Sequence, residues 1–155
     1  MFNKALKTQY EDLSLGEDVA SCIASAASND ELVLRVIAEI AKRDRVLLKF
    51  QKEGNIDKDR IYGVTKDEIR KSISFGEKKV TSGGKKGEIV TAHPAIKKID
   101  SIIAFLMGAT IVYYEKHASK HKRYLFTSRA IEVILILQKR GYLSIEEILK
   151  EAKEN

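Results

Sequence analysis

The stretch Ile99–Tyr114, IDSIIAFLMGATIVYY, decides the fold that the sequence predicts. Its apolar residues recur every three or four positions, as on an α-helix, and little of the circumference is polar. Between Asp100 and Glu115 lie 14 uncharged residues, whereas a membrane-spanning helix needs about 20. The pattern therefore predicts a buried core helix that begins just after Pro94 and continues through Tyr114.

Further helices are predicted before and after this core helix. The expected elements are a short helix over 14–27 with an inward stripe of Val19, Cys22, Ile23 and Ala26; a long helix opened by the capping box Ser28–Glu31 and ended by Gly54; a helix capped by Thr127 or Ser128 and stopped by Gly141; and a last short helix opened by Ser144. Because the start and stop signals agree with the apolar periodicity, most of the chain is predicted to be helical.

The middle third, residues 55–92, has a different composition, rich in glycine and lysine. Thr65 and Glu68 form another capping box, which predicts a helix of two turns. The segments 79–82 and 85–90 are typical of the strands of a β-hairpin, with a tight turn at Gly83 and Gly84. We therefore predict a mainly α fold, a helical bundle formed by residues 1–54 and 93–155. A small β-rich insertion, the β-hairpin, occupies residues 55–92.

The composition indicates a soluble, basic protein. The chain has 155 residues and a net charge of +6, and its many Ile, Lys and Glu residues resemble the composition of thermophile proteins. The N-terminal residues MFNKALKTQYEDL carry acids and lack the apolar core of a signal peptide, which favours a cytoplasmic location. The single cysteine, Cys22, is expected to be a buried thiol.

The sequence gives no support for an enzyme, a cofactor or a metal site. No phosphate-binding glycine loop, CxxC pair or HExxH pattern occurs. His117 and His121 are four residues apart and could share a helical face as metal ligands. The lysines and the arginine that surround them would repel a divalent cation. We therefore expect a non-catalytic protein.

Clusters of basic residues are the clearest functional signal. The candidate nucleic-acid-binding residues are Lys116, Lys120, Lys122 and Arg123, in an elbow expected after the core helix, and Lys78, Lys79, Lys85 and Lys86, on the predicted hairpin. Such side chains on loops neutralise phosphates without reading bases, and the tyrosines beside the elbow could stack on unpaired bases. The pattern predicts sequence-independent binding of nucleic acid. The alternative is that these charges only keep the protein soluble.

The order of the segments resembles a known family. SLGEDVASCIASAAS precedes a long helix, a glycine-rich segment with β-strands follows, and HPAIKKIDSIIAFLMGATIVYYEKHASKHKRY and FTSRAIEVILILQKRGYL return to helix. This layout resembles the small subunit of the archaeal type I-A CRISPR interference complex (Cascade). The resemblance implies a non-catalytic subunit in antiviral defence, with a capacity for self-association. Its expected partners are guide RNA or target DNA strands and the other subunits of a ribonucleoprotein complex.

Two other functions are compatible with the sequence. In the first, the protein is a winged-helix transcription regulator with Thr65–Ile73 as a short recognition helix and Lys78–Val90 as its wing. Against this assignment, Asp67 and Glu68 would lie at the end of the helix that approaches DNA. In the second, the protein is a scaffold that binds other proteins through the small residues of the helix 14–27 and contacts no nucleic acid.

Overall fold

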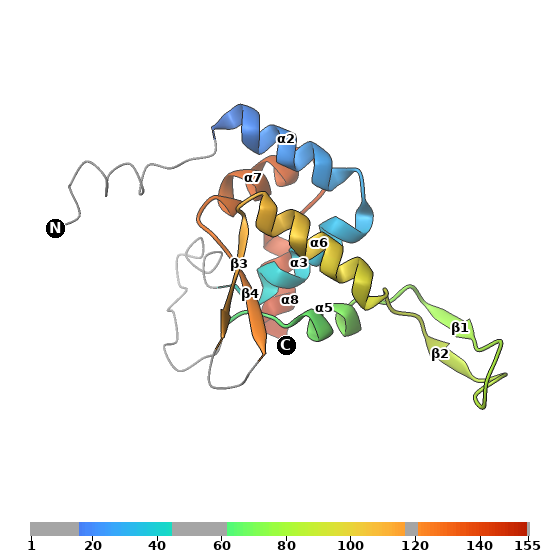
Figure 1. Ribbon diagram of the computed structural model, residues 1–155. Helices are drawn as coiled ribbons and strands as arrows, with labels where there is room; N and C mark the ends of the chain where they lie inside the picture. Colours follow the sequence, from blue (N-terminus) through green and yellow to red (C-terminus); the bar gives the residue numbers. More distant parts are fainter. Residues whose placement is uncertain (1–15, 45–61, 117–120, 155) are drawn as a thin grey trace.

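A computed structural model of the protein describes residues 16–44, 62–116 and 121–154 (Figure 1). These residues form six helices and two two-stranded antiparallel sheets, so the fold is mainly α with a small β part. The helices are α2 (Glu17–Ser28), α3 (Glu31–Lys42), α5 (Lys66–Ser72), α6 (Ile96–Gly108), α7 (Ala130–Lys139) and α8 (Ile145–Glu154). The strands are β1 (Glu77–Lys79), β2 (Ile89–Thr91), β3 (Val112–Lys116) and β4 (Lys122–Phe126). In this part of the chain no helix has both the length and the apolar character needed to cross a membrane.

Helix α6 is the apolar helix that the sequence predicts, but it ends sooner than expected. Its buried face consists of Ile99, Ile102, Ile103 and Leu106. The helix stops at Gly108 because Thr110 takes a left-handed conformation with φ 65°, and the Ile111 N–H donates back to the Leu106 carbonyl. The predicted continuation to Tyr114 is wrong. Residues 112–116 form β3, since their β-branched and aromatic side chains suit a pleated strand better than a helix.

The described residues of the basic elbow, 116 and 121–123, belong to a β-hairpin and not to a connection between two helices. β3 pairs with β4 along its whole length in antiparallel register. Val64 bridges to Tyr124 through backbone hydrogen bonds of 3.2 and 2.8 Å, so β4 lies between residue 64 and β3. The buried carboxylate of Asp44, just after α3, accepts a hydrogen bond of 2.6 Å from the Phe126 N–H. This bond fixes β4 against the helices.

The middle third is not a separate insertion over its whole length. Val64, Ile69 and Ile73 are buried in the same core as the helices, and α5 packs against α3 and α6. The two-turn helix predicted after Thr65 is confirmed as α5. Residues 62–73 of the predicted insertion therefore belong to the helical core, and the β1–β2 hairpin is the part that projects from it (Figure 1).

A hairpin is confirmed, but its strands and its turn differ from the prediction: the predicted strands 79–82 and 85–90 share only Lys79, Ile89 and Val90 with β1 and β2. β1 and β2 pair antiparallel, and residues 80–88 connect them. The predicted tight turn at Gly83 and Gly84 is wrong, because the two strands are joined by a loop of residues 80–88 that is closed by a hydrogen bond between Gly87 and Val80. Gly87, with φ 94°, donates its N–H to the Val80 carbonyl at 3.0 Å.

Helix α2 is confirmed, but it buries a different face from the predicted stripe. Ala20, Ala24 and Ala27 are fully buried and α2 packs against α7, while Val19 and Cys22 are exposed. Small side chains at a contact let two helices approach closely. The expectation of a buried thiol is therefore wrong. The alanine face that the scaffold hypothesis needs is already covered within the chain.

The ends of the other helices differ from the prediction in detail. The cap of α3 is Asp30, whose carboxylate accepts from the Leu32 N–H at 2.9 Å, and not Ser28, whose hydroxyl donates back to the Ser25 carbonyl. Helix α3 ends at Lys42, and the remainder of the predicted long helix, residues 45–54, lies outside the described residues. Helices α7 and α8 are confirmed, but α7 has no side-chain cap.

Candidate nucleic-acid interface

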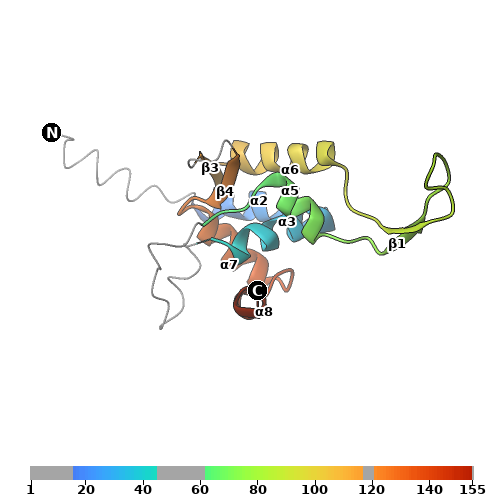
Figure 2. The ribbon, with the colours of Figure 1, turned by 90° about the horizontal axis from the view of Figure 1, so that it is seen from below.

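Helix α6 lies at the surface of the molecule with a β-hairpin at each end. β3–β4 lies by its C-terminal end and β1–β2 beyond its N-terminal end, and the view from below in Figure 2 shows the same order. The exposed side of its first half carries Lys97, Lys98 and Ser101, whose hydroxyl donates to the Lys97 carbonyl at 3.0 Å.

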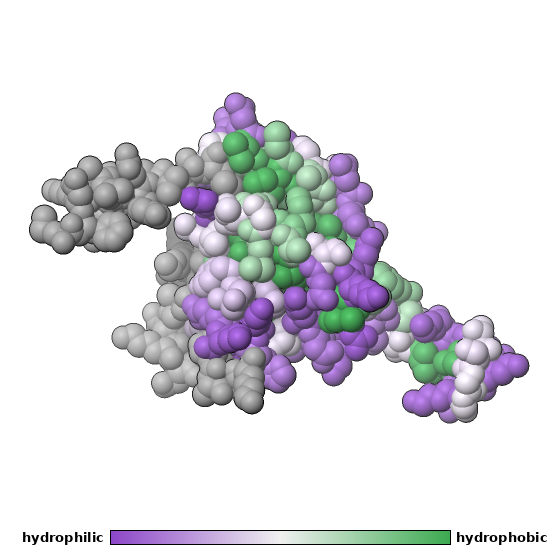
Figure 3. Space-filling view, viewed as in Figure 1, coloured by the Kyte–Doolittle hydropathy of each residue, from purple (hydrophilic) through white to green (hydrophobic). Residues whose placement is uncertain are grey.

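The second half of α6 has an apolar outer side. Phe105 is 37% exposed and Met107 is 36% exposed. Figure 3 shows that this apolar surface continues over α2. The polar contacts that α6 offers to a ligand therefore lie in its N-terminal half.

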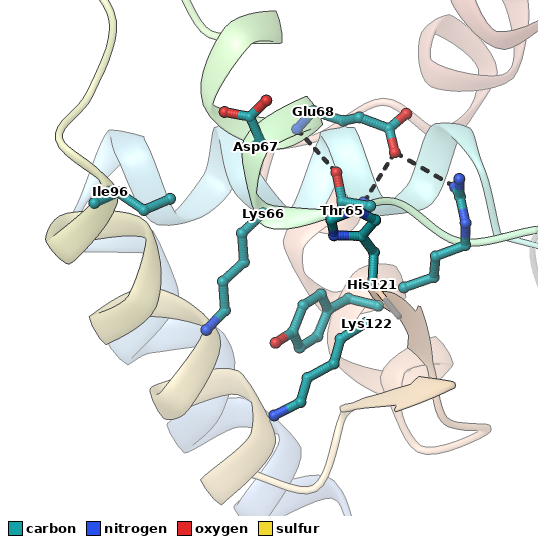
Figure 4. Close-up of a pocket in the computed structure, with 9 residues that line it drawn as sticks. Thr65, Lys66, Asp67, Glu68, Ile96, His121 and Lys122 are labelled. Carbon is teal, nitrogen blue, oxygen red and sulfur yellow. Dashed lines mark hydrogen bonds and ion pairs between the residues drawn. The ribbon is translucent and has the colours of Figure 1, made fainter. Parts of the chain in front are cut away.

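A pocket of about 650 Å³ lies between α6, the first turn of α5 and β4 (Figure 4). It is lined by Thr65, Lys66, Asp67, Glu68, Ile96, His121, Lys122, Arg123 and Tyr124. Helix α6 and β4 thus form two sides of a concave surface, and α5 forms a third. Most of the side chains that line it are charged or polar.

Glu68 joins three elements at one edge of this pocket. Thr65 Oγ1 accepts from the Glu68 N–H at 3.1 Å, and Glu68 Oε1 accepts from the Thr65 N–H at 3.2 Å, which completes the predicted capping box. The same carboxylate pairs with Arg43, after α3, and with Arg123 of β4. Burial by itself would raise the pKa of Glu68, but the Thr65 N–H and the two guanidinium groups outweigh it and lower that pKa.

Arg123 has a structural place in this network, although the sequence predicts it to bind nucleic acid. Its half-buried guanidinium lies 3.4 Å from Glu68 and donates to the Gly63 carbonyl at 3.3 Å. These contacts hold β4 against α5. Arg123 therefore positions the hairpin more than it offers charge to a ligand.

Lys66 links α5 to α6 across the pocket. Its ammonium lies 2.8 Å from Asp100 Oδ1 and 5.6 Å from the ring centroid of Tyr124. The hydrogen bond with Asp100 raises the pKa of Lys66 and outweighs the lowering by burial. Lys66 is thus charged, and Asp100 neutralises part of that charge locally.

Lys116 and Lys122 are the exposed cations at the far end of β3–β4. They lie directly opposite each other in the strand pair, and none of the ion pairs within the described residues includes either. The Lys122 ammonium lies 4.5 Å from the ring centroid of Tyr114, which is 41% exposed. Like charges directly opposite on antiparallel strands destabilise the pair. A bound anion would relieve this repulsion.

The predicted lysines fall into two groups, one on each hairpin, and Lys122 of the first group lines the same pocket as Ile96, the first residue of α6. The second group is on the β1–β2 hairpin, where Lys78 and Lys79 of β1 and Lys85 and Lys86 of the loop are all exposed. Lys120 and His117 lie outside the described residues. The structure thus does not join the two groups into one patch but places them on either side of α6.

Three polar residues of α6 were missed by the sequence prediction. The sequence prediction assigns no binding role to Lys97, Lys98 or Ser101, because it expects the whole helix to be buried. Their spacing of i, i+1 and i+4 puts them on the side away from the buried isoleucines, and this periodicity is the signal that could have found them.

The exposed lysines around α6 can bind an extended anion. Within the described ranges, no group of three or more His, Cys, Asp or Glu side chains is placed to hold a metal ion. The chain matches no protein-family model, and neither a curated protein nor a solved structure shows significant similarity to it.

Proposed function

We propose that the protein binds duplex DNA as a winged-helix module, with α6 in the major groove and β3–β4 as the wing. The order of elements carries this proposal: α3, the bridge at Val64, α5, α6, β3 and β4, with β4 between residue 64 and β3. Helices α3, α5 and α6 pack on one another and on this sheet, as in a winged helix. The assignment of residues 65–73 as recognition helix and 78–90 as wing is replaced by this one.

A fold alone does not define a function, so the residues of the site must support DNA binding as well. The exposed residues of α6 and of β3–β4 do so. Helix α6 has 13 residues, and a major groove about 12 Å wide admits a helix of this kind. A recognition helix contacts bases with its N-terminal residues. That half of α6 exposes Lys97, Lys98 and Ser101, and its apolar half lies further from the expected contact.

The wing supplies contacts to the phosphate backbone. Lys116 and Lys122 are exposed beside the pocket that separates β4 from α6. Lysines bind phosphate oxygens without reading bases, so they strengthen binding to any sequence. The connection between α5 and α6 departs from the usual short turn because the β1–β2 hairpin occupies it.

A second proposal follows from the resemblance to the small subunit of a type I-A CRISPR complex. In it, the protein is a cytoplasmic, non-catalytic subunit whose helical bundle contacts other subunits and whose exposed lysines hold a guide RNA or a target DNA strand. The exposed lysines of both hairpins favour this role as well, since backbone contact is all that it needs. It requires no base contact from α6.

Selection from a pool of random duplexes separates the two proposals. The winged-helix proposal predicts enrichment of a defined sequence, and Lys97→Ala with Ser101→Ala should relax that preference. Lys116→Ala with Lys122→Ala should weaken all sequences alike and reduce the slope of log affinity against log salt by about 0.9 for each lysine. Arg123 stays unchanged because it holds Glu68.

The matched control is the pair Lys139→Ala and Lys150→Ala, which removes the same charge from exposed positions on α7 and α8. It should leave the selected sequence unchanged. Binding without any enriched sequence, unaffected by the α6 variant, would contradict the winged-helix proposal and favour the CRISPR subunit.

A further inference from the structure

We infer that the β1–β2 hairpin is a second DNA-binding element, which holds the phosphate backbone of the duplex beside the segment that α6 reads. This inference rests on the proposed winged-helix function. The hairpin stands at the N-terminal end of α6, on the other side from the wing (Figures 1 and 2). Helix α6 thus lies between two lysine-bearing hairpins.

The hairpin does not contribute to the core. None of the residues 77–91 is buried, and Ile89 is 68% exposed. Its charged residues are Lys78, Lys79, Lys85, Lys86, Glu77 and Glu88, all exposed. None of the ion pairs within the described residues includes the four lysines. The segment therefore presents net positive charge that the folded chain leaves unused.

The base of the hairpin is nevertheless fixed to the protein. The Phe75 N–H donates to the Ala92 carbonyl at 2.8 Å, and the Ala92 N–H donates to the Gly76 carbonyl at 2.7 Å. From α3, Arg35 donates to the Ser74 carbonyl at 3.2 Å and lies 6.0 Å from the Phe75 ring centroid.

On the other side of the base, His93 Nδ1 lies 2.9 Å from the Ile73 carbonyl, and the buried Pro94 follows two residues before α6 begins. The base of the hairpin, residues 73–76 and 92–93, is thus held at a set place relative to α6.

The chemistry of the hairpin matches a phosphate backbone. Lys78 and Lys79 are adjacent on β1, so they point to opposite faces, and Lys85 and Lys86 lie in the loop. The hairpin thus carries positive charge on both faces and in its loop. Side chains that contact consecutive phosphates of a DNA strand need no shaped pocket, so this distribution of charge is suited to the backbone. Residues 76–82 span at most about 20 Å when fully extended, which equals at most about six base pairs at 3.4 Å each.

Excision of the hairpin tests the inference. Residues 77–91 are replaced by two glycines that join Gly76 to Ala92, whose backbone atoms already lie 2.7 Å apart. The core should keep its fold because no buried side chain is lost. With the selected sequence in a long duplex, hydroxyl-radical protection should be shorter on one side only, by up to about six base pairs. A shorter duplex that contains only the base pairs contacted by α6 and the wing should bind the intact and the excised protein equally.

The double variant Lys85→Ala with Lys86→Ala tests the charge without the deletion. It should weaken binding to the long duplex by up to about eightfold for each lysine at 0.1 M salt. Each phosphate contact multiplies the binding constant by the salt concentration, in M, raised to the power of about −0.9, and this factor is about eight at 0.1 M. Lys139→Ala with Lys150→Ala is the matched control and should change affinity much less. Equal protection by the excised and intact proteins would overturn the inference and leave the winged-helix proposal standing.

Two other results have distinct meanings. If the excised protein loses an acidic protein partner but keeps its full footprint, the hairpin is a protein-binding element and the inference is wrong. If the intact protein selects no duplex sequence, the winged-helix proposal fails, and the inference fails with it.

Discussion

Gly63 lies close against β4, one of the two strands of the proposed wing. Its φ is 94°, and a Cβ there would lie 2.9 Å from the Arg123 Cβ and 3.2 Å from the Leu125 Cγ. Its own N–H donates to the Arg43 carbonyl at 2.8 Å. Glycine is therefore required at this position for both conformation and space.

We expect Gly63→Ala to lower the free energy of unfolding by about 2–5 kcal/mol. The left-handed conformation costs an L-residue about 1–2 kcal/mol, and crowding against β4 adds about 1–3 kcal/mol in a packed site. Urea unfolding measures the loss. The control is Gly84→Ala, where a Cβ meets nothing within 4 Å. Equal stability of the two variants would contradict both the conformational and the steric cost at Gly63.

Thr110 shows at the same scale why one part of the sequence prediction failed. It takes the left-handed position that ends α6, as Gly141, with φ 82°, does after α7. A glycine there would have predicted the helix end, but a threonine gives no such signal. The apolar periodicity then continued into Ile111 and Val112, so one long helix was predicted where the chain forms a helix and a strand.

At the scale of elements, Glu68 couples α5 to α3 and to β4. Because its pKa is lowered in the folded protein, the carboxylate stabilises the fold above the unfolded pKa, about 4.3. That stabilisation is lost as the pH falls through the lower, folded pKa. We expect Glu68→Gln to lower the free energy of unfolding by about 1.5–3 kcal/mol at pH 7, the range for hydrogen bonds to a charged group.

The pH series supplies the decisive comparison for Glu68. The difference between the native protein and Glu68→Gln should shrink in acid, once the native carboxyl is protonated. Glu146→Gln, an exposed residue in the first turn of α8, is the control and should change stability little. A difference that persists unchanged at acid pH would mean that the shape of the side chain matters and its charge does not.

Elements whose signals come from residues close in the sequence could be predicted, and features that depend on distant segments could not. The helix α5 with its capping box needs only neighbouring residues, and so does the stop of α7 at Gly141. The buried face of α2 was not predictable in this way. Val19 and Cys22 are more apolar or larger than the alanines, yet the alanine face is buried because α7 approaches it closely. That choice depends on a helix more than a hundred residues away in the chain.

At the scale of the whole molecule, the residue types of the candidate site could be predicted and their arrangement could not. Lysines in polar segments are visible in the sequence, and six of the eight predicted cations are exposed lysines in the structure. Their relation to α6 depends on the bridge between Val64 and Tyr124, which brings distant segments together. Without that bridge, α6 is expected to be only core, and the winged-helix alternative assigns the wing to residues 78–90 and not to β3–β4, the hairpin that we propose.

The net charge of +6 gives the molecule a general self-repulsion, and the opposed Lys116 and Lys122 add a local one. Lys116→Glu lowers the net charge to +4 and puts opposite charges face to face. Lys79→Glu makes the same change of charge opposite the apolar Ile89, so the comparison isolates the local pair. We expect Lys116→Glu to be more stable than Lys79→Glu by about 1 kcal/mol at low salt.

Salt should separate stability from binding in these two variants. At 1 M salt the screening length is about 3 Å, so the stability advantage of Lys116→Glu should largely disappear in urea unfolding. Both variants should bind DNA more weakly than the native protein at low salt, because each loses a cation and gains an anion at a proposed phosphate contact. A protein that becomes more stable but binds less would mean that the opposed lysines are kept for their ligand at a cost to the fold. If Lys116→Glu bound DNA as tightly as the native protein, the repulsion between Lys116 and Lys122 would not be explained by phosphate binding. The wing would then have to be assigned to other residues.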